Sequence, residues 1–160
     1  AVSATTPVAA QGMSEKLMME VKSMVKHEKH AAAIHGRRIA MRTMGGEMKK
    51  IAVFVKAGTG TANDVAAAGK EVAAIAKKLP ELFPAGSSHE KYGKATGAKE
   101  VVWEKMGDFK AAAMTLAEKA ENLVKVASAG GDKGAIAAAF GSMGKDGCGG
   151  CHRTFRQKLN

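Results

Sequence analysis

Five consecutive residues near the C-terminus combine two thiols with one imidazole: Cys148-Gly149-Gly150-Cys151-His152. The C-x-x-C-H spacing is typical of covalent attachment of a c-type haem. Two thiols three residues apart can each form a thioether with one vinyl group of the porphyrin, and the adjacent imidazole then reaches the iron as an axial ligand. We therefore predict that Cys148 and Cys151 anchor one haem c and that His152 binds its iron.

Two other chemistries also use paired cysteines, and the sequence favours neither. A thioredoxin-like redox pair needs a preceding strand and a βαβ unit, and no such pattern surrounds the motif. A zinc site needs a second pair of ligands, whereas the chain has only two cysteines.

The elements that must position this motif are predicted to be helices. Hydrophobic residues make up 46% of the chain and aromatic residues only 4%, which favours helices with a core of aliphatic residues and Met. Apolar residues at helical spacing predict four segments: a first one from Ser14 through Ala57 with a break at His35-Gly36 or Gly45-Gly46, then Asn63–Lys78, Ala98–Ala129 and Asp132–Leu159. The segment from Leu82 to Gly97 shows no period and is expected to be a long connection that covers a ligand.

These segments predict an all-α fold, an antiparallel up-down-up-down four-helix bundle with an N-terminal helical extension. We expect residues 1–13 to form a flexible tail and residues 14–160 to form one haem-binding domain. The small residues of the tail resemble the mature side of a cleaved export signal.

The charge pattern bears on partners. The net charge is +10, yet the lysines are dispersed among glutamates and aromatic residues are scarce, so nucleic acid is not expected as a partner. Residues 14–50 carry a net +5 and residues 145–160 a net +3, a distribution that suits acidic redox protein partners.

No apolar run is long enough to span a membrane. The sequence contains no P-loop, dinucleotide-binding, zinc-protease or nucleophile-elbow motif, so we expect a protein that is not an enzyme.

A C-x-x-C-H motif about ten residues from the end of an alanine-rich four-helix chain resembles the cytochrome c′ family. The resemblance extends over about Arg37 to Lys158. It includes these patterns: Arg37-Arg38-Ile39-Ala40-Met41, Met44-Gly45-Gly46-Glu47-Met48-Lys49, Leu82-Phe83-Pro84-Ala85-Gly86, Ala98-Lys99 before Trp103, and Phe155-Arg156 after the motif. The family implies one haem held in a bundle, frequently in a homodimer, in the bacterial periplasm. Phe155 stands where the family usually has Tyr, and the residues before the match, with His27 and His30, have no clear counterpart.

The resemblance also places Met41 at the open side of the iron. There its sulfur either binds iron as a sixth ligand, which suits a one-electron carrier, or covers a five-coordinate iron that binds small gases such as NO and CO. We expect His/Met ligation by His152 and Met41, with gas binding as the alternative. A peroxidase is disfavoured because no distal acid–base pair is evident. Met44 and Met48 share the helical spacing and are expected to be core packing.

Three arginines are further candidates for haem contacts. Arg37 lies one turn before Met41, and the resemblance points to bidentate binding of a haem propionate. Arg38 is the adjacent candidate. Arg156 follows His152 by four residues and is expected to shield its imidazole or tune its charge. Lys26 and Lys29, next to His27 and His30, indicate that His27, His30 and His35 lie on a solvated face rather than in a metal site.

Overall fold

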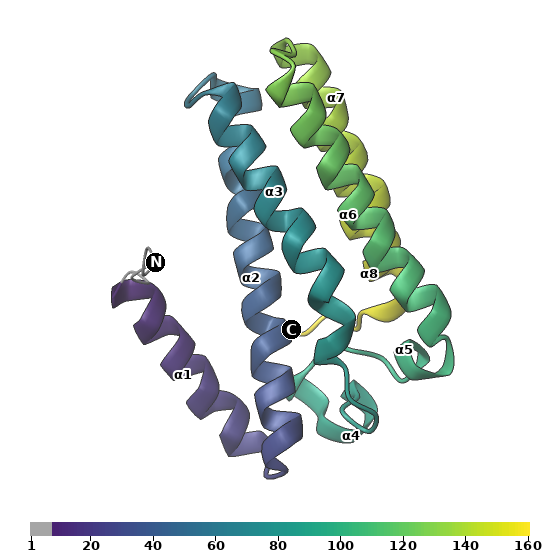
Figure 1. Ribbon diagram of the computed structural model, residues 1–160. Helices are drawn as coiled ribbons and strands as arrows, with labels where there is room; N and C mark the ends of the chain where they lie inside the picture. The colour runs from purple at the N-terminus through teal and green to yellow at the C-terminus, as the bar shows by residue number, and fades with distance from the viewer. Residues whose placement is uncertain (1–7) are drawn as a thin grey trace, which may run out of the picture.

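The computed structural model describes residues 8–160 and is mostly helical, with no strand in that range. The main helices are α1 (Val8–Met24), α2 (Glu28–Ala57), α3 (Ala62–Lys78), α6 (Met106–Ser128), α7 (Lys133–Ser142) and α8 (Gly149–Phe155). Helices α2, α3 and α6, with α7 and α8 together as the fourth, run alternately up and down, and α1 lies outside against α2 (Figure 1). The predicted four-helix bundle with an N-terminal helical extension is confirmed.

The first helical segment breaks earlier than the sequence predicted. α1 ends at Met24, and α2 begins after His27, whose Nδ1 accepts a hydrogen bond from the backbone N–H of His30 at 3.2 Å. The predicted break at His35-Gly36 or Gly45-Gly46 is wrong, because α2 runs straight through these glycines. At Gly36 the missing side chain is used for packing, since a Cβ there would meet Leu82 Cδ2 at 3.3 Å. α1 also starts at Val8, before the predicted Ser14, so the expected tail 1–13 is shorter, and residues 1–7 lie outside the described part.

The other helices differ from prediction at their ends. α3 is capped by Thr61 rather than Asn63, through a capping box with Asp64. The predicted helix from Ala98 is interrupted at Lys105, which separates α5 (Val101–Glu104) from α6. The predicted C-terminal helix is capped by Asp132 as expected, but it contains a π-helical turn, Met143–Cys148, and ends at Phe155 rather than Leu159.

The connection between α3 and α6 is partly ordered into short helices. It contains a 3₁₀ turn (Leu79–Leu82), α4 (His89–Tyr92), a second 3₁₀ turn (Gly93–Ala95) and α5. Its end is joined to the end of α8, because Gln157 N donates to Gly97 O at 2.7 Å and Lys99 N donates to Phe155 O at 3.0 Å. The connection is therefore fixed to the helix that carries the Cys-Cys-His motif.

The apolar residues form two separate clusters. The main core lies between α2, α3, α6 and α7, and α3 and α6 form its most extensive helix pair. The smaller cluster joins α1 to α2 and to the connection, through Leu17, Val21, Val25, Ala31, Ile34 and Ala95. The bundle core is thus complete without α1.

Candidate haem site

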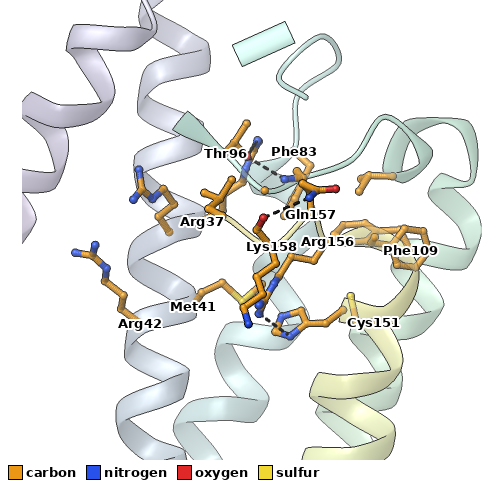
Figure 2. Close-up of a pocket in the computed structure, with 17 residues that line it drawn as sticks. Arg37, Met41, Arg42, Phe83, Thr96, Phe109, Cys151, Arg156, Gln157 and Lys158 are labelled. Atoms are coloured by element: carbon orange, nitrogen blue, oxygen red, sulfur yellow. Dashed lines mark hydrogen bonds between the residues drawn. The ribbon is translucent and has the colours of Figure 1, made fainter. Parts of the chain in front are cut away.

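A cavity of about 460 Å³ lies between α2, α8 and the connection. Met41 lines it from α2, and Cys151 and His152 line it from α8. In Figure 2, Met41 extends from α2 toward the side on which Cys151 lies. The structure therefore brings the predicted distal residue and the predicted proximal ligand to one cavity, of a size that ligand pockets commonly have.

The two thiols are half-buried and unpaired. Burial raises the pKa of Cys148, and burial together with the neighbouring Cys148 raises the pKa of Cys151 to about 11. Redox-active cysteine pairs need a lowered pKa because the thiolate is the reactive form. The raised pKa values of both thiols do not favour thioredoxin-like exchange. Among residues 8–160, no group of three or more His, Cys, Asp and Glu side chains could hold a metal ion by itself.

Arg156 contacts the imidazole of His152, as the sequence predicted. Its Nη1 lies 3.2 Å from His152 Nδ1; because a guanidinium only donates, this contact puts the proton of a neutral ring on Nε2, and Nε2 can bind iron only once that proton has moved to Nδ1 or left the ring. Burial, and secondly the positive charge of Arg156, lower the pKa of His152. The neutral imidazole required of a metal ligand is therefore favoured.

Arg37 makes contacts that the sequence did not predict. It is buried, and its terminal nitrogens donate to four acceptors in the connection: Leu82 O at 3.3 Å, Ser87 Oγ at 2.8 Å, Ser87 O at 2.5 Å and Thr96 Oγ1 at 2.7 Å. The guanidinium also lies over the ring of Phe83, 4.7 Å from its centroid. Desolvation lowers the pKa of Arg37 to about 10. Because these bonds use the four terminal N–H groups, the predicted propionate contact of Arg37 would have to compete with them, and Arg37 holds the cavity wall through them.

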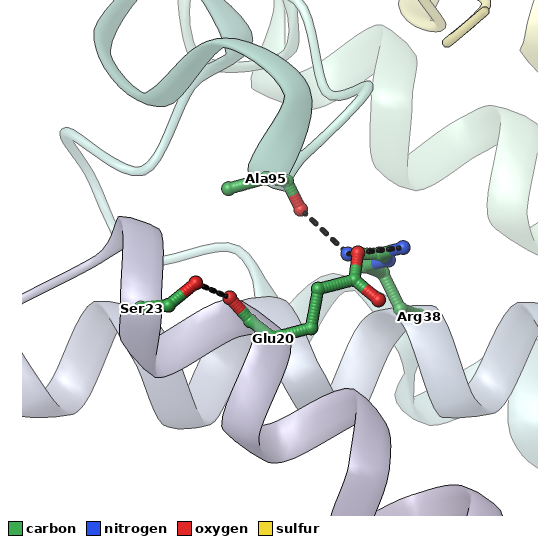
Figure 3. Close-up of polar contacts among 4 residues, drawn as sticks. All are labelled: Glu20, Ser23, Arg38 and Ala95. Atoms are coloured by element: carbon green, nitrogen blue, oxygen red, sulfur yellow. Dashed lines mark hydrogen bonds and ion pairs between the residues drawn. The ribbon is translucent and has the colours of Figure 1, made fainter.

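Arg38 lines the cavity but is also engaged elsewhere. Its Nη1 and Nη2 each lie 3.2 Å from Glu20 Oε1 of α1, and Nη1 donates to Ala95 O at 3.3 Å (Figure 3). The predicted propionate contact of Arg38 would therefore compete with an ion pair.

Several cavity residues were not singled out from the sequence. Arg42, one turn after Arg38, and Lys158 are exposed cations of the lining, and no carboxylate belongs to the lining among the described residues. The i to i+4 spacing of Arg38 and Arg42 was a signal available in the sequence. Cations without carboxylates fit the two propionates of a haem.

Aromatic rings form the apolar wall of the cavity. Phe109 packs edge-on against Phe83, with ring centroids 4.6 Å apart, and against Phe155 at 5.3 Å. Trp103 Nε1 donates to Phe83 O at 3.0 Å and fixes this part of the connection. Phe155 is buried, so a ring without a hydroxyl group suits its surroundings. An apolar, ring-lined cavity fits the faces of a porphyrin.

Two groups outside the cavity bear on the remaining sequence predictions. Met44 is buried in the main core, and Met48 packs against this core. Neither methionine lines the cavity, as predicted for methionines that serve core packing. The solvated face predicted for the first histidines is wrong for His30, which is buried, stacks on His27 with ring centroids 3.9 Å apart, and shares a 2.8 Å hydrogen bond between Nδ1 and Tyr92 Oη.

The helical bundle, with Cys151 and His152 at an apolar cavity and Cys148 three residues before Cys151, defines a c-type haem protein of the four-helix class. The family model described as Cytochrome C′ matches residues 32–156. The chain is 36% identical over 127 residues to cytochrome c′ of Pararhodospirillum photometricum, with 79% of this chain and 97% of the relative covered. It is 34% identical over 129 residues to cytochrome c-556 of Agrobacterium tumefaciens (strain B2A), with 80% and 99% covered.

Solved structures agree with the sequence comparisons. Cytochrome c′ of Thermochromatium tepidum superposes with a TM-score of 0.68 at 28% identity, over 79% of this chain and 95% of the other. Another solved cytochrome c′, described as having ligand-controlled dimer dissociation, superposes with a TM-score of 0.68 at 27% identity, over 79% and 95%. The chain belongs to the cytochrome c′ family and is a haem c protein.

In this family protein, Cys148 and Cys151 are the residues that would hold the haem covalently, and His152 is the residue that would bind its iron. A bound haem would supply an iron that can exchange one electron or bind a small ligand. Arg156 contacts the imidazole, Phe83, Phe109 and Phe155 form the apolar wall, and Arg37 fixes the connection to α2. Among residues 8–160, no helix is both long and apolar enough to cross a membrane.

Proposed function

We propose that this protein binds small diatomic gases, such as NO and CO, at a five-coordinate haem iron held by His152, with Met41 covering the open side without binding the metal. The observation that carries the proposal is the apolar cavity of about 460 Å³ that Met41 and His152 share. A cytochrome c′ variant of the same fold, from Alcaligenes xylosoxidans, was solved as a nitric oxide complex, with a TM-score of 0.69 at 22% identity over 81% of this chain and 96% of the other. The sequence favoured His/Met ligation, and neither the cavity nor the comparisons support a bond from Met41 to iron.

One-electron transfer to an acidic protein partner is the second candidate. It is supported by Arg42, Arg156 and Lys158, which are exposed at the cavity. Such a basic rim steers acidic proteins toward the haem edge, and the association should weaken as salt is added.

Both functions are consistent with a periplasmic protein, because members of the cytochrome c′ family receive their haem in the periplasm. The homodimer that the family suggests stays a prediction.

The test is carbon monoxide binding by the reduced holoprotein, with variants on one helix. The wild-type protein should bind carbon monoxide, and Met41→Ala should bind it about tenfold faster or more, because truncation removes the side chain that covers the iron. Met48→Ala is the matched control, since Met48 lies on the same helix and outside the cavity lining, and its rate should stay within about twofold of wild type.

Two results would contradict the proposal. If the reduced wild-type protein fails to bind carbon monoxide, a sixth ligand already occupies the haem iron. A spectrum that changes from low-spin to high-spin only in Met41→Ala would identify Met41 as that ligand and would support the electron carrier.

A further inference from the structure

Helix α1 is an addition to the part of the chain that the family shares. The family match starts at residue 32, after α1 has ended. α1 packs through its own small cluster, in which Leu17, Val21 and Val25 are at most 1% exposed. A 17-residue helix is marginal in isolation, so α1 depends on this contact for its order. It can therefore be packed or released while the separate main core stays folded.

Polar contacts also hold α1 in the packed position. Arg38 of α2 binds the carboxylate of Glu20 on α1 and donates to the carbonyl of Ala95 in the connection (Figure 3). His35 Nε2 donates to Ser14 O at 2.9 Å, nearer the start of α1. One arginine thus joins the added helix, the first bundle helix and the connection.

The residues that follow Ala95 belong to the cavity. Thr96 and Gly97 line it. Thr96 Oγ1 accepts from Arg37 Nη2 at 2.7 Å, and Gly97 O accepts from Gln157 N at 2.7 Å. Ala95 is fully buried in the cluster that α1 completes. Ala95, which α1 helps to bury, is thus the direct chain neighbour of two wall residues.

We propose that α1 is a strap, packed against Ala95 and held by the Glu20–Arg38 pair, that keeps the wall at Thr96 and Gly97 closed and so limits the entry of small ligands to the cavity. The inference that α1 limits the entry of small ligands rests on the proposed gas binding. The inference that α1 holds the cavity wall at Thr96 and Gly97 is independent of that proposal. Release of the strap should open the wall without unfolding α3 and α6, because their core does not include α1.

The test is amide hydrogen exchange of the holoprotein, with Thr96, Ala98 and Gln157 as reporters of the wall. Their N–H groups donate to Gly93 O, Thr96 Oγ1 and Gly97 O. The double variant Leu17→Ala/Val21→Ala should speed their exchange at least about tenfold, because large-to-small changes in a core are costly. Glu20→Gln should speed it by about two- to fivefold, the range expected from loss of a partly exposed ion pair. Exchange in the middle of α3 and α6 should stay at the wild-type rate.

Two matched controls lie on the same helix. Met19→Ala removes an apolar side chain that is 73% exposed. Glu15→Gln removes an exposed carboxylate that forms no ion pair among the described residues. Both should leave exchange at the three reporters within about twofold of wild type.

The outcomes separate the strap from gas binding. If α1 amides exchange faster in the double variant while the wall reporters do not change, the strap is refuted. If the reporters exchange faster but the carbon monoxide association rate does not rise, control of entry is refuted. If no form of the protein binds carbon monoxide, the proposed gas binding fails, and the exchange data still decide whether α1 holds the wall.

Discussion

Gly97 is the position where a single methyl group should separate the cavity wall from the haem-carrying helix. A Cβ at Gly97 would lie 2.5 Å from Gln157 O and 3.5 Å from Arg156 Cγ. Since 3.4 Å is the beginning of ordinary contact, Gly97→Ala requires a shift of about 0.9 Å between two backbone segments. A flexible side chain could move away at little cost, but the first contact here is a backbone carbonyl.

The cost follows from what this shift breaks. The hydrogen bonds from Gln157 N to Gly97 O and from Lys99 N to Phe155 O join the same two segments. Losing them costs about 1 kcal/mol each, and overpacking costs about 1–3 kcal/mol. A destabilisation of roughly 3 kcal/mol lowers the Tm of a protein of this size by roughly 6–12 °C.

The assay is thermal unfolding of the holoprotein followed by circular dichroism. Gly45→Ala is the matched control, because Gly45 lies inside α2 and a Cβ there would have nothing within 4 Å. Alanine at this position should raise the Tm by about 2–4 °C. If Gly97→Ala unfolds within about 2 °C of wild type, the close contact between the wall and the end of α8 is refuted.

Three further predictions concern attachment, the wall and pH. Replacing both Cys148 and Cys151 by Ala should leave haem that acid–acetone extracts completely, whereas the single variants should retain it; extraction of haem from the wild type would contradict covalent attachment. Arg37→Lys should lower the Tm by roughly 4–8 °C, because an ammonium cannot reach four acceptors, and an unchanged Tm would show that the guanidinium does not hold the wall. Burial, and secondly the charge of His27, lower the pKa of His30 below 6.5, so the unfolded chain takes up this proton at a higher pH than the folded protein does. The free energy of unfolding, measured in urea, should therefore fall as the pH drops below about 6.5. His30→Gln should lose this part of the pH dependence, and an unchanged pH dependence in that variant would contradict the assignment.

The bundle was predictable because its signals are local. Helical spacing of apolar residues and the C-x-x-C-H motif are both readable over a few turns of chain, and both led to the observed architecture. The helix ends were less predictable because tertiary contacts decide them. Gly36 was expected to break α2, but Leu82 packs into the space that it leaves, and the break occurs where the His27 side chain caps the next helix.

The site was predictable where one helix carries it and unpredictable where separate segments meet. Arg156 contacts His152 because residues four apart share a helix face. The contacts of Arg37 could not be predicted, since its acceptors Ser87 and Thr96 lie 50 and 59 residues away in a segment without periodicity. The aromatic wall was missed for the same reason: Phe83, Phe109 and Phe155 come together only in the fold.

The optical spectrum of the purified holoprotein, oxidised and reduced, with and without carbon monoxide, tests the central claim most directly. A five-coordinate iron beneath an uncoordinated Met41 predicts a broad high-spin spectrum and a clear shift when carbon monoxide is added to the reduced protein. Sharp low-spin bands, a ferric sulfur-to-iron charge-transfer band and no response to carbon monoxide would contradict it.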